Sequence, residues 1–227
     1  MRLRRPGGTD VSGRKILRRF ASSVVALACL IAVPAAWGGS VLDAMHHFFQ
    51  DSRTVTADFT QKVSRPDGQV VKRAAGRLWI SRPGKFRWTY EGSDGEVIVS
   101  NGRKVWLYEP ALQQATVQPL GTALSSTPAA LIAGRNPLSR QFTVRILPTG
   151  PGGLDWVLLL PKEGQSQGFT SIRMGFDHQG RLQEMRMEDA FQQTTTLKFS
   201  KIHINGPIAS SKFRFSPPPG VDVLTNP

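Results

Sequence analysis

The feature that most constrains the fold is a long succession of short segments in which apolar and polar residues alternate, from about residue 54 to residue 204. Alternation with period two is typical of β-strands, because successive side chains point to opposite faces of a sheet. We count about ten or eleven such segments, mostly joined by turns of hairpin length. One antiparallel sheet with that many strands must curl. The pattern therefore predicts a mainly β (α+β) fold, in which the sheet forms a barrel or half-barrel with one concave face.

Three positions give local detail to this sheet. The sequence RPDGQ at 65–69 has the composition of a turn and predicts a hairpin. Gly76, inside the returning strand, is interpreted as a bend or bulge. Asn101-Gly102 is the pair that favours a two-residue type I′ turn, so a second tight hairpin is expected there.

Two segments depart from the alternating pattern and predict helices. Residues 40–51 place an apolar stripe at helical spacing behind Ser40, with Asp43 three positions later as a capping-box partner. Residues 122–134 contain the helix-start signal Ser126-Thr127-Pro128 and end at Gly134, which can terminate the helix. Two helices are too few to form a layer of their own, but they can cover the open side of a curled sheet.

The N-terminus has the pattern of an export signal. Seven Lys or Arg residues precede the apolar run at 21–37, and small residues follow it. We expect a cleaved signal peptide at 1–38 and one mature domain at 39–227. An uncleaved membrane anchor is the alternative, and Arg18-Arg19 leaves a twin-arginine signal open. Cys29, the only cysteine, would be lost on cleavage.

Composition and motifs argue against several functions. Removal of residues 1–38 leaves 22 basic and 15 acidic residues, a net charge of +7, and the basic residues are dispersed. This fits weak association with an acidic surface or partner, and no aromatic-basic RNA motif is present, so nucleic-acid binding is not expected. His46 and His47 are adjacent, so on a helix they diverge by about 100° and cannot chelate one metal. No nucleophile with a plausible base is found, so we expect neither an enzyme nor a metal site.

Aromatic and methionine residues recur on single strand faces. Phe86, Trp88 and Tyr90 share one face, as do Ile172, Met174 and Phe176, and also Met185 and Met187. Each stripe alone is more often ordinary core than a ligand site. Together, in a curled sheet covered by only two short helices, they favour an apolar pocket for a hydrocarbon ligand.

Several blocks of the sequence resemble the outer-membrane lipoprotein carrier proteins (LolA) of Gram-negative periplasms. They occur in the family's order and spacing: ADFTQKV, GRLWISRPGKFRWTY, VIVSNGRKVWLYEP, QQATVQPL, TPAALIAG and FRFSPPPGV. The resemblance covers essentially the whole predicted mature chain. It implies an unclosed, strongly curved antiparallel β-barrel with a short helical lid over an apolar cavity.

The resemblance also implies a function and a set of site residues. Such carriers take acylated lipoproteins from an inner-membrane lipoprotein-releasing ABC transporter and deliver them to an outer-membrane receptor lipoprotein (LolB-like), without a cofactor. Arg82 matches the arginine that contacts the lid helix and holds the empty cavity shut. The other matching positions are the cavity mouth at Phe86, the cavity wall at Trp88, and the lid at Ala129 and Ile132. We expect Phe49 on the first helix to be an inner apolar contact, and Tyr90 to belong to the wall because it shares a strand face with Phe86 and Trp88.

Other functions remain open from the sequence. The same fold could carry another acylated lipid, or it could belong to a regulatory protein that senses lipoproteins. We expect a monomer, because transfer of a cargo needs an open cavity mouth, although unpaired strand edges leave dimerisation open.

Overall fold

The computed structural model describes residues 40–225 except 93–94, 124–126, 135–137 and 164–167. The signal peptide expected at 1–38 lies outside the described residues. Within the described part, no helix combines the length and the apolar character that crossing a membrane requires.

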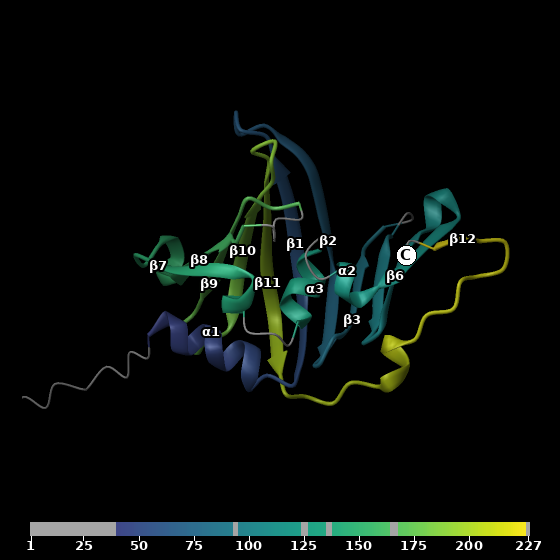
Figure 1. The fold of residues 1–227 in the computed structure, drawn as a ribbon, viewed down its shortest axis with the longest axis horizontal. Helices are drawn as coiled ribbons and strands as arrows, with labels where there is room; N and C mark the ends of the chain where they lie inside the picture. The colour runs from purple at the N-terminus through teal and green to yellow at the C-terminus, as the bar shows by residue number, and fades with distance from the viewer. Residues whose placement is uncertain (1–39, 93–94, 124–126, 135–137, 164–167, 226–227) are drawn as a thin grey trace, which may run out of the picture. The chain divides into compact units, whose positions relative to one another are not determined.

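Twelve strands form one sheet, in the order β12-β6-β5-β4-β3-β2-β1-β11-β10-β9-β8-β7 (Figure 1). Every neighbouring pair is antiparallel except β12 and β6, which are parallel. The strands β7 and β12 stand at the two ends of this order, so the barrel is unclosed, and the predicted mainly β fold is confirmed. The strands are β1 Thr54–Ser64, β2 Val70–Ser81, β3 Lys85–Tyr90, β4 Val97–Asn101, β5 Lys104–Glu109, β6 Gln114–Pro119, β7 Phe142–Leu147, β8 Asp155–Pro161, β9 Ser171–Phe176, β10 Leu182–Glu188, β11 Thr194–Ile204 and β12 Asp222–Thr225.

In the residues that the structure describes, three α-helices accompany the sheet. They are α1 Val41–Gln50, α2 Leu120–Ala123 and α3 Pro128–Ala133, and single 3₁₀ turns occupy Pro110–Leu112, Leu138–Arg140, Pro151–Gly153 and Ser210–Phe213. The predicted capping box is present, because the Ser40 hydroxyl accepts from the Asp43 backbone while the Asp43 carboxylate accepts from the Ser40 backbone. Of the helix predicted at 122–134, residues 122–123 form the end of α2, and α3 begins after Thr127. The segment 124–126 lies outside the described residues.

The alternating strand positions separate two faces, as predicted. The inner face carries the main core, to which α1 and α3 also contribute buried side chains. The stripes Phe86/Trp88, Ile172/Met174/Phe176 and Met185/Met187 all belong to this core, and each of these side chains is at most 2% exposed.

The curl depends on bulges and on one close backbone approach. The register shifts at Ala57 between β1 and β11, and at Gln183 between β10 and β9. Such bulges bend and twist a strand locally. Gly76 is not a bulge, since the register of β2 runs through it unbroken on both sides. It permits close packing instead, because a Cβ there would lie 2.0 Å from the Thr89 carbonyl oxygen.

The predicted type I′ turn at Asn101-Gly102 is wrong. A type I′ turn needs positive φ at both central residues, and only Gly102 has it, at +94°. The Asn101 side-chain oxygen instead accepts from the backbone N–H groups of Arg103 and Lys104, at 2.9 and 3.0 Å. Asparagine forms such a local turn readily, which accounts for the longer connection.

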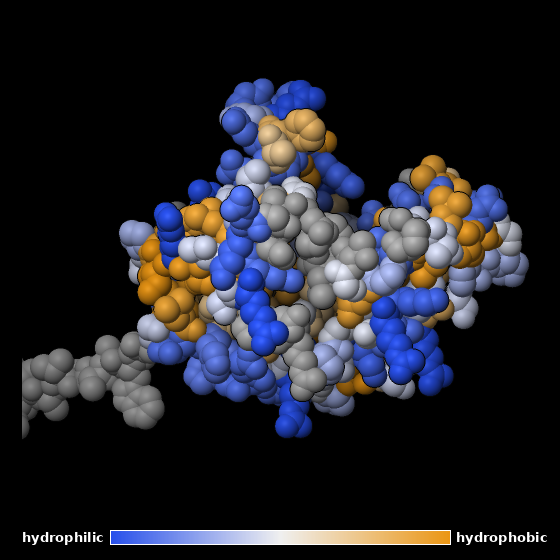
Figure 2. All heavy atoms as spheres, viewed as in Figure 1, coloured by the Kyte–Doolittle hydropathy of each residue, from blue (hydrophilic) through white to orange (hydrophobic). Residues whose placement is uncertain are grey.

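The C-terminal segment covers part of the outer face. It packs Phe213, at 5% exposure, against the strands β3 and β4 and then continues to β12 (Figure 1). Val99, on the outer face of β4, is fully buried, and the Phe215 ring lies 5.5 Å from that of Tyr108. Figure 2 shows hydrophobic surface near β12, where Leu224 is half exposed.

Candidate functional site

The helix α3 forms a short lid over the inner face of the sheet. Its N-cap Thr127 accepts a hydrogen bond from the Ala130 backbone N–H at 3.2 Å, and Pro128 starts the first turn with the backbone angle that a helix needs. The residues from Ala129 to Ala133 are all buried. Because a six-residue helix is not stable alone, its position depends on what holds it against the sheet.

Arg82, in the connection between β2 and β3, joins three parts of the fold. Its Nη2 donates to the Ile132 carbonyl oxygen of α3 at 3.0 Å, and its Nη1 donates to the Ser52 carbonyl oxygen between α1 and β1. The last carbonyls of a helix have no partner within the helix, so a guanidinium with several donors suits this place. One side chain therefore links the lid to the sheet and to the segment after α1.

The surroundings of the guanidinium are mostly apolar. Its central carbon lies 5.0 Å from the centre of the Phe48 ring and 5.6 Å from that of Phe49, both on α1. Burial lowers the pKa of Arg82 to about 10, so the group remains charged at neutral pH. A charge in such a place depends on its carbonyl acceptors and on the aromatic faces beside it.

The turn that carries Arg82 is held by backbone and side-chain bonds. Gly84, with φ of +70°, donates its backbone N–H to the Ala133 carbonyl oxygen at 3.3 Å, which adds a second link to the lid. The hydroxyl of Ser100 is fully buried and donates to the Gly84 carbonyl oxygen at 2.7 Å. These bonds fix where the Arg82 side chain begins.

The space between the lid, α1 and the sheet is almost filled. The apolar cavity that remains there has a volume of about 10 Å³, which is about the room of one water molecule. Its walls are made by Phe48, Val55, Ala57, Leu78, Ile80, Ile132, Leu182, Phe199 and Ile202. The space that remains beneath α3 is therefore too small for a hydrocarbon chain.

The sequence-predicted residues fall at different places around this cavity. Only Ile132 lines it directly. Phe86 and Trp88 are buried in the adjoining core, and the centres of the Trp88 and Phe59 rings lie 4.3 Å apart. Phe49 is half-buried beneath Arg82. Tyr90 is partly buried at the end of its strand.

Tyr90 marks a more polar end of the inner face. Its hydroxyl donates to the Gln61 side-chain oxygen at 2.8 Å, and burial, with a smaller contribution from Glu96, raises its pKa. The sequence pattern placed Tyr90 in the apolar wall. In the structure Tyr90 is on the same face as Phe86 and Trp88, but its hydroxyl also forms a hydrogen bond with Gln61.

Sequence reasoning missed Phe48, which lines the cavity beside the singled-out Phe49. The two are adjacent on α1 and point about 100° apart, so helical spacing alone did not decide between them. Leu78, Ile80 and Phe199 were visible as alternating strand residues, but nothing in the pattern distinguished cavity wall from ordinary core. Within the described ranges, no group of three or more His, Cys, Asp or Glu side chains is placed to hold a metal ion.

Comparisons with known proteins agree on one family. The family model described as "Outer membrane lipoprotein carrier protein LolA" matches residues 50–216. The Outer-membrane lipoprotein carrier protein of Dechloromonas aromatica (strain RCB) is 37% identical over 201 residues, which cover 88% of this chain and 95% of that protein. The protein of the same name from Methylibium petroleiphilum is 40% identical over 200 residues, which cover 87% of this chain and 96% of that protein.

A solved structure supports the fold alone. The crystal structure of an uncharacterized conserved protein from Thermus thermophilus superposes with a TM-score of 0.52 at 14% identity, and covers 82% of this chain and 97% of that one.

Proposed function

Because the chain belongs to the family of outer-membrane lipoprotein carrier proteins, LolA, we propose that it is a periplasmic carrier that shields the acyl chains of lipoproteins. The observation that carries this proposal is the link from Arg82 to the Ile132 carbonyl oxygen, which closes a helical lid over an apolar, almost filled core. A carrier needs such a closed empty form, because an open apolar cavity in water would be costly and prone to aggregate.

The energies are suited to reversible opening. A hydrogen bond from a charged donor contributes about 1.5–3 kcal/mol. Burial of one methylene group contributes about 0.8 kcal/mol. Breaking the Arg82–Ile132 bond is therefore offset by burying about two to four methylenes, far fewer than one acyl chain has. On release the same bond re-forms, which lowers the energy of the empty protein and favours delivery.

We assign the proposed roles as follows. Arg82 is the latch, and Phe49 supports its guanidinium. Ile132 is the lid contact. Phe86, Trp88 and Tyr90 form the wall that faces acyl chains once the lid moves. No covalent bond is made or broken in this function, so no catalytic residue is proposed.

The direction of transport sets the proposed partners. Cargo would come from an inner-membrane lipoprotein-releasing ABC transporter and pass to an outer-membrane receptor lipoprotein of the LolB type. The working form would be a monomeric single domain of residues 39–227 in the periplasm, after removal of the signal peptide at 1–38.

A release assay tests the proposal. Inner-membrane vesicles that contain the transporter and a labelled triacylated lipoprotein are incubated with ATP and this protein. The expected result is a soluble one-to-one complex whose formation needs both ATP and the protein. Absence of release, with a transporter active toward another carrier, would contradict the proposal.

The two other functions predict different results. Lipid analysis of the protein isolated from periplasm would give free acyl lipid without lipoprotein for a carrier of another lipid. A sensing regulatory protein would retain lipoprotein but not deliver it to outer membranes.

A further inference from the structure

The outer face of the sheet carries a row of basic side chains that the carrier role does not use. Residues directly opposite one another on neighbouring strands share a face, and the pairing therefore orders the row from β7 to β2. It consists of Arg145, Leu158, Arg173, Arg186, Thr196, Lys62 and Arg73. Five of these seven residues are cations and none is an anion. We call this set the basic row.

The fold does not gain from this arrangement. Arg173 lies directly opposite Arg186, and Lys62 directly opposite Arg73, and like charges in such positions repel. In the part of the chain that the structure describes, Arg145, Arg173, Lys62 and Arg73 form no ion pair, and all four are exposed. An arrangement that costs stability, and that leaves these charges free, indicates a binding role.

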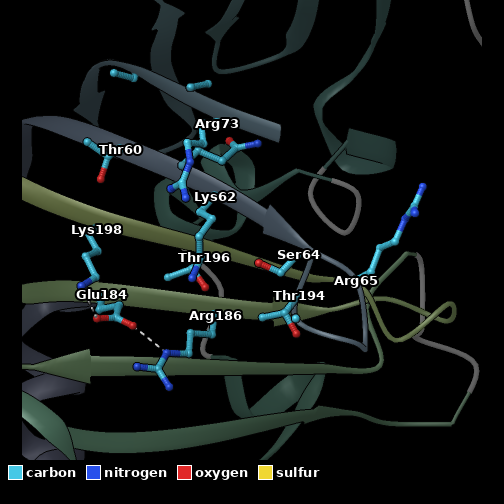
Figure 3. Close-up of a pocket in the computed structure, with 14 residues that line it drawn as sticks. Thr60, Lys62, Ser64, Arg65, Arg73, Glu184, Arg186, Thr194, Thr196 and Lys198 are labelled. Atoms are coloured by element: carbon cyan, nitrogen blue, oxygen red, sulfur yellow. Dashed lines mark hydrogen bonds and ion pairs between the residues drawn. The ribbon is translucent and has the colours of Figure 1, made fainter. Parts of the chain in front are cut away.

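A hollow of about 1040 Å³ lies along the middle of the basic row, over the strands β2, β1, β11 and β10 (Figure 3). Figure 3 shows Arg73, Lys62, Thr196 and Arg186 following one another across these strands. The charged side chains that line the hollow are Lys62, Arg65, Arg73, Arg186, Lys198 and Glu184, which gives a net charge of +4.

Among the described residues that line the hollow, one is acidic, and its charge is already neutralised. Glu184 is 8% exposed, and its carboxylate lies 2.6 Å from Arg186 Nε and 3.9 Å from Lys198 Nζ. The Arg186 guanidinium also lies 4.8 Å from the centre of the Trp156 ring. Arg186 is thus held in place from two sides, while Lys62 and Arg73 remain available to a ligand.

We propose that the basic row and its hollow bind an acidic segment of a partner protein. Seven strands spaced about 4.8 Å apart give the row a length of roughly 29 Å, which matches about nine residues of extended chain. A polypeptide segment can enter the hollow, whereas a planar membrane surface would touch only its rim. The charge of the row is complementary to Asp and Glu side chains.

The position of this surface separates it from the lid. The basic row lies on the face opposite the one that α3 covers, so an acidic segment bound there leaves Arg82 and the lid free to move. Binding to this surface does not depend on whether the cavity holds a lipoprotein, and the proposal stands apart from the carrier function.

The test uses the purified protein and a fluorescein-labelled peptide of ten glutamates, with binding followed by fluorescence anisotropy at several salt concentrations. The triple variant Lys62→Gln, Arg73→Gln, Arg173→Gln should weaken binding at least about fivefold and reduce its salt dependence. The matched control is Lys85→Gln, Arg103→Gln, Lys104→Gln, which removes three exposed charges elsewhere. Its effect should stay below about twofold.

Three results would overturn the proposal. Equal weakening in both triple variants would mean that only the net charge matters. Absence of peptide binding by the unaltered protein at low salt would exclude an acidic segment. Cosedimentation with phosphatidylglycerol-containing vesicles that depends on the same three residues, without a matching effect on the peptide, would identify a membrane surface instead.

Discussion

Replacement of Arg82 by leucine should shift the lid toward its open form. The exchange keeps an apolar stem but removes the bond to the Ile132 carbonyl oxygen, which joins the latch to α3. The bond to Ser52 does not reach the lid, so we count only one charge-assisted bond, of about 1.5–3 kcal/mol. The open form should therefore gain about 10- to 150-fold in population relative to the closed form.

Thiol labelling measures this opening directly. From residue 40 onward the chain contains no cysteine, and Ala130 on α3 is fully buried. A cysteine at Ala130→Cys should react with a thiol reagent only when the lid moves. In the Arg82→Leu background its labelling rate should rise by the same factor of about 10 to 150.

Two controls separate lid opening from other effects. Arg87→Leu removes a nearby arginine that donates to the Lys212 carbonyl oxygen and has no bond to the lid, so it should leave the rate unchanged. Val99→Cys reports unfolding, because Val99 is fully buried on the other face of the sheet. The latch argument would fail if the cysteine of Ala130→Cys were labelled no faster with Arg82→Leu than with Arg82 intact. It would also fail if Arg82→Leu raised the labelling rate of Val99→Cys by the same factor.

The same exchange has a consequence for transport. Cargo binds the open form, so a larger open population raises the apparent affinity for cargo by the same factor. The Arg82→Leu protein should accept lipoprotein but pass it on poorly. Normal transfer from this variant to outer membranes would contradict the proposed role.

Three further changes test the supports of the site and the fold. Ser100→Ala leaves the buried Gly84 carbonyl oxygen without its partner and should lower the free energy of unfolding in urea by about 1–3 kcal/mol; an unchanged midpoint would contradict this. Gly76→Ala places a Cβ 2.0 Å from the Thr89 carbonyl oxygen and should cost at least about 3 kcal/mol or prevent folding, so a soluble variant with the normal urea midpoint would exclude the close approach. Burial raises the pKa of Glu96, so ionisation of this carboxyl opposes folding. Glu96→Gln should therefore be more stable than the unaltered protein at pH 7, and this difference should disappear in acid below the usual pKa of a glutamate. Thermal unfolding measured across pH tests this, and an equal melting temperature of the two proteins at pH 7 would contradict it.

Much of the sheet could be predicted because its signals are local. Alternation placed Phe86 and Trp88 on one buried face, and the capping pair Ser40 and Asp43 located the start of α1 to the residue. Thr127-Pro128 likewise located the start of the lid helix. Each of these three predictions depends on residues that lie only a few positions apart in the sequence.

The remaining features depend on residues far apart or on the backbone. The latch is completed by the carbonyl oxygens of Ser52 and Ile132, and since every residue has a carbonyl, no side-chain pattern identifies which one accepts. The parallel pairing of β12 with β6 needs the long C-terminal segment to cross the outer face. The basic row likewise appears only once seven strands are aligned.

Photocross-linking from inside the cavity tests the central claim most directly. A photoreactive benzoylphenylalanine is placed at Phe48 or Phe199, which line the cavity, or at Phe191, which is 79% exposed. Each protein is loaded with a lipoprotein labelled in its acyl chains and then irradiated. The carrier account predicts cross-links to the acyl chains from Phe48 and Phe199 and none above background from Phe191. Cross-links from Phe191 alone, or equal cross-linking from all three positions, would show that the acyl chains do not occupy the space beneath the lid.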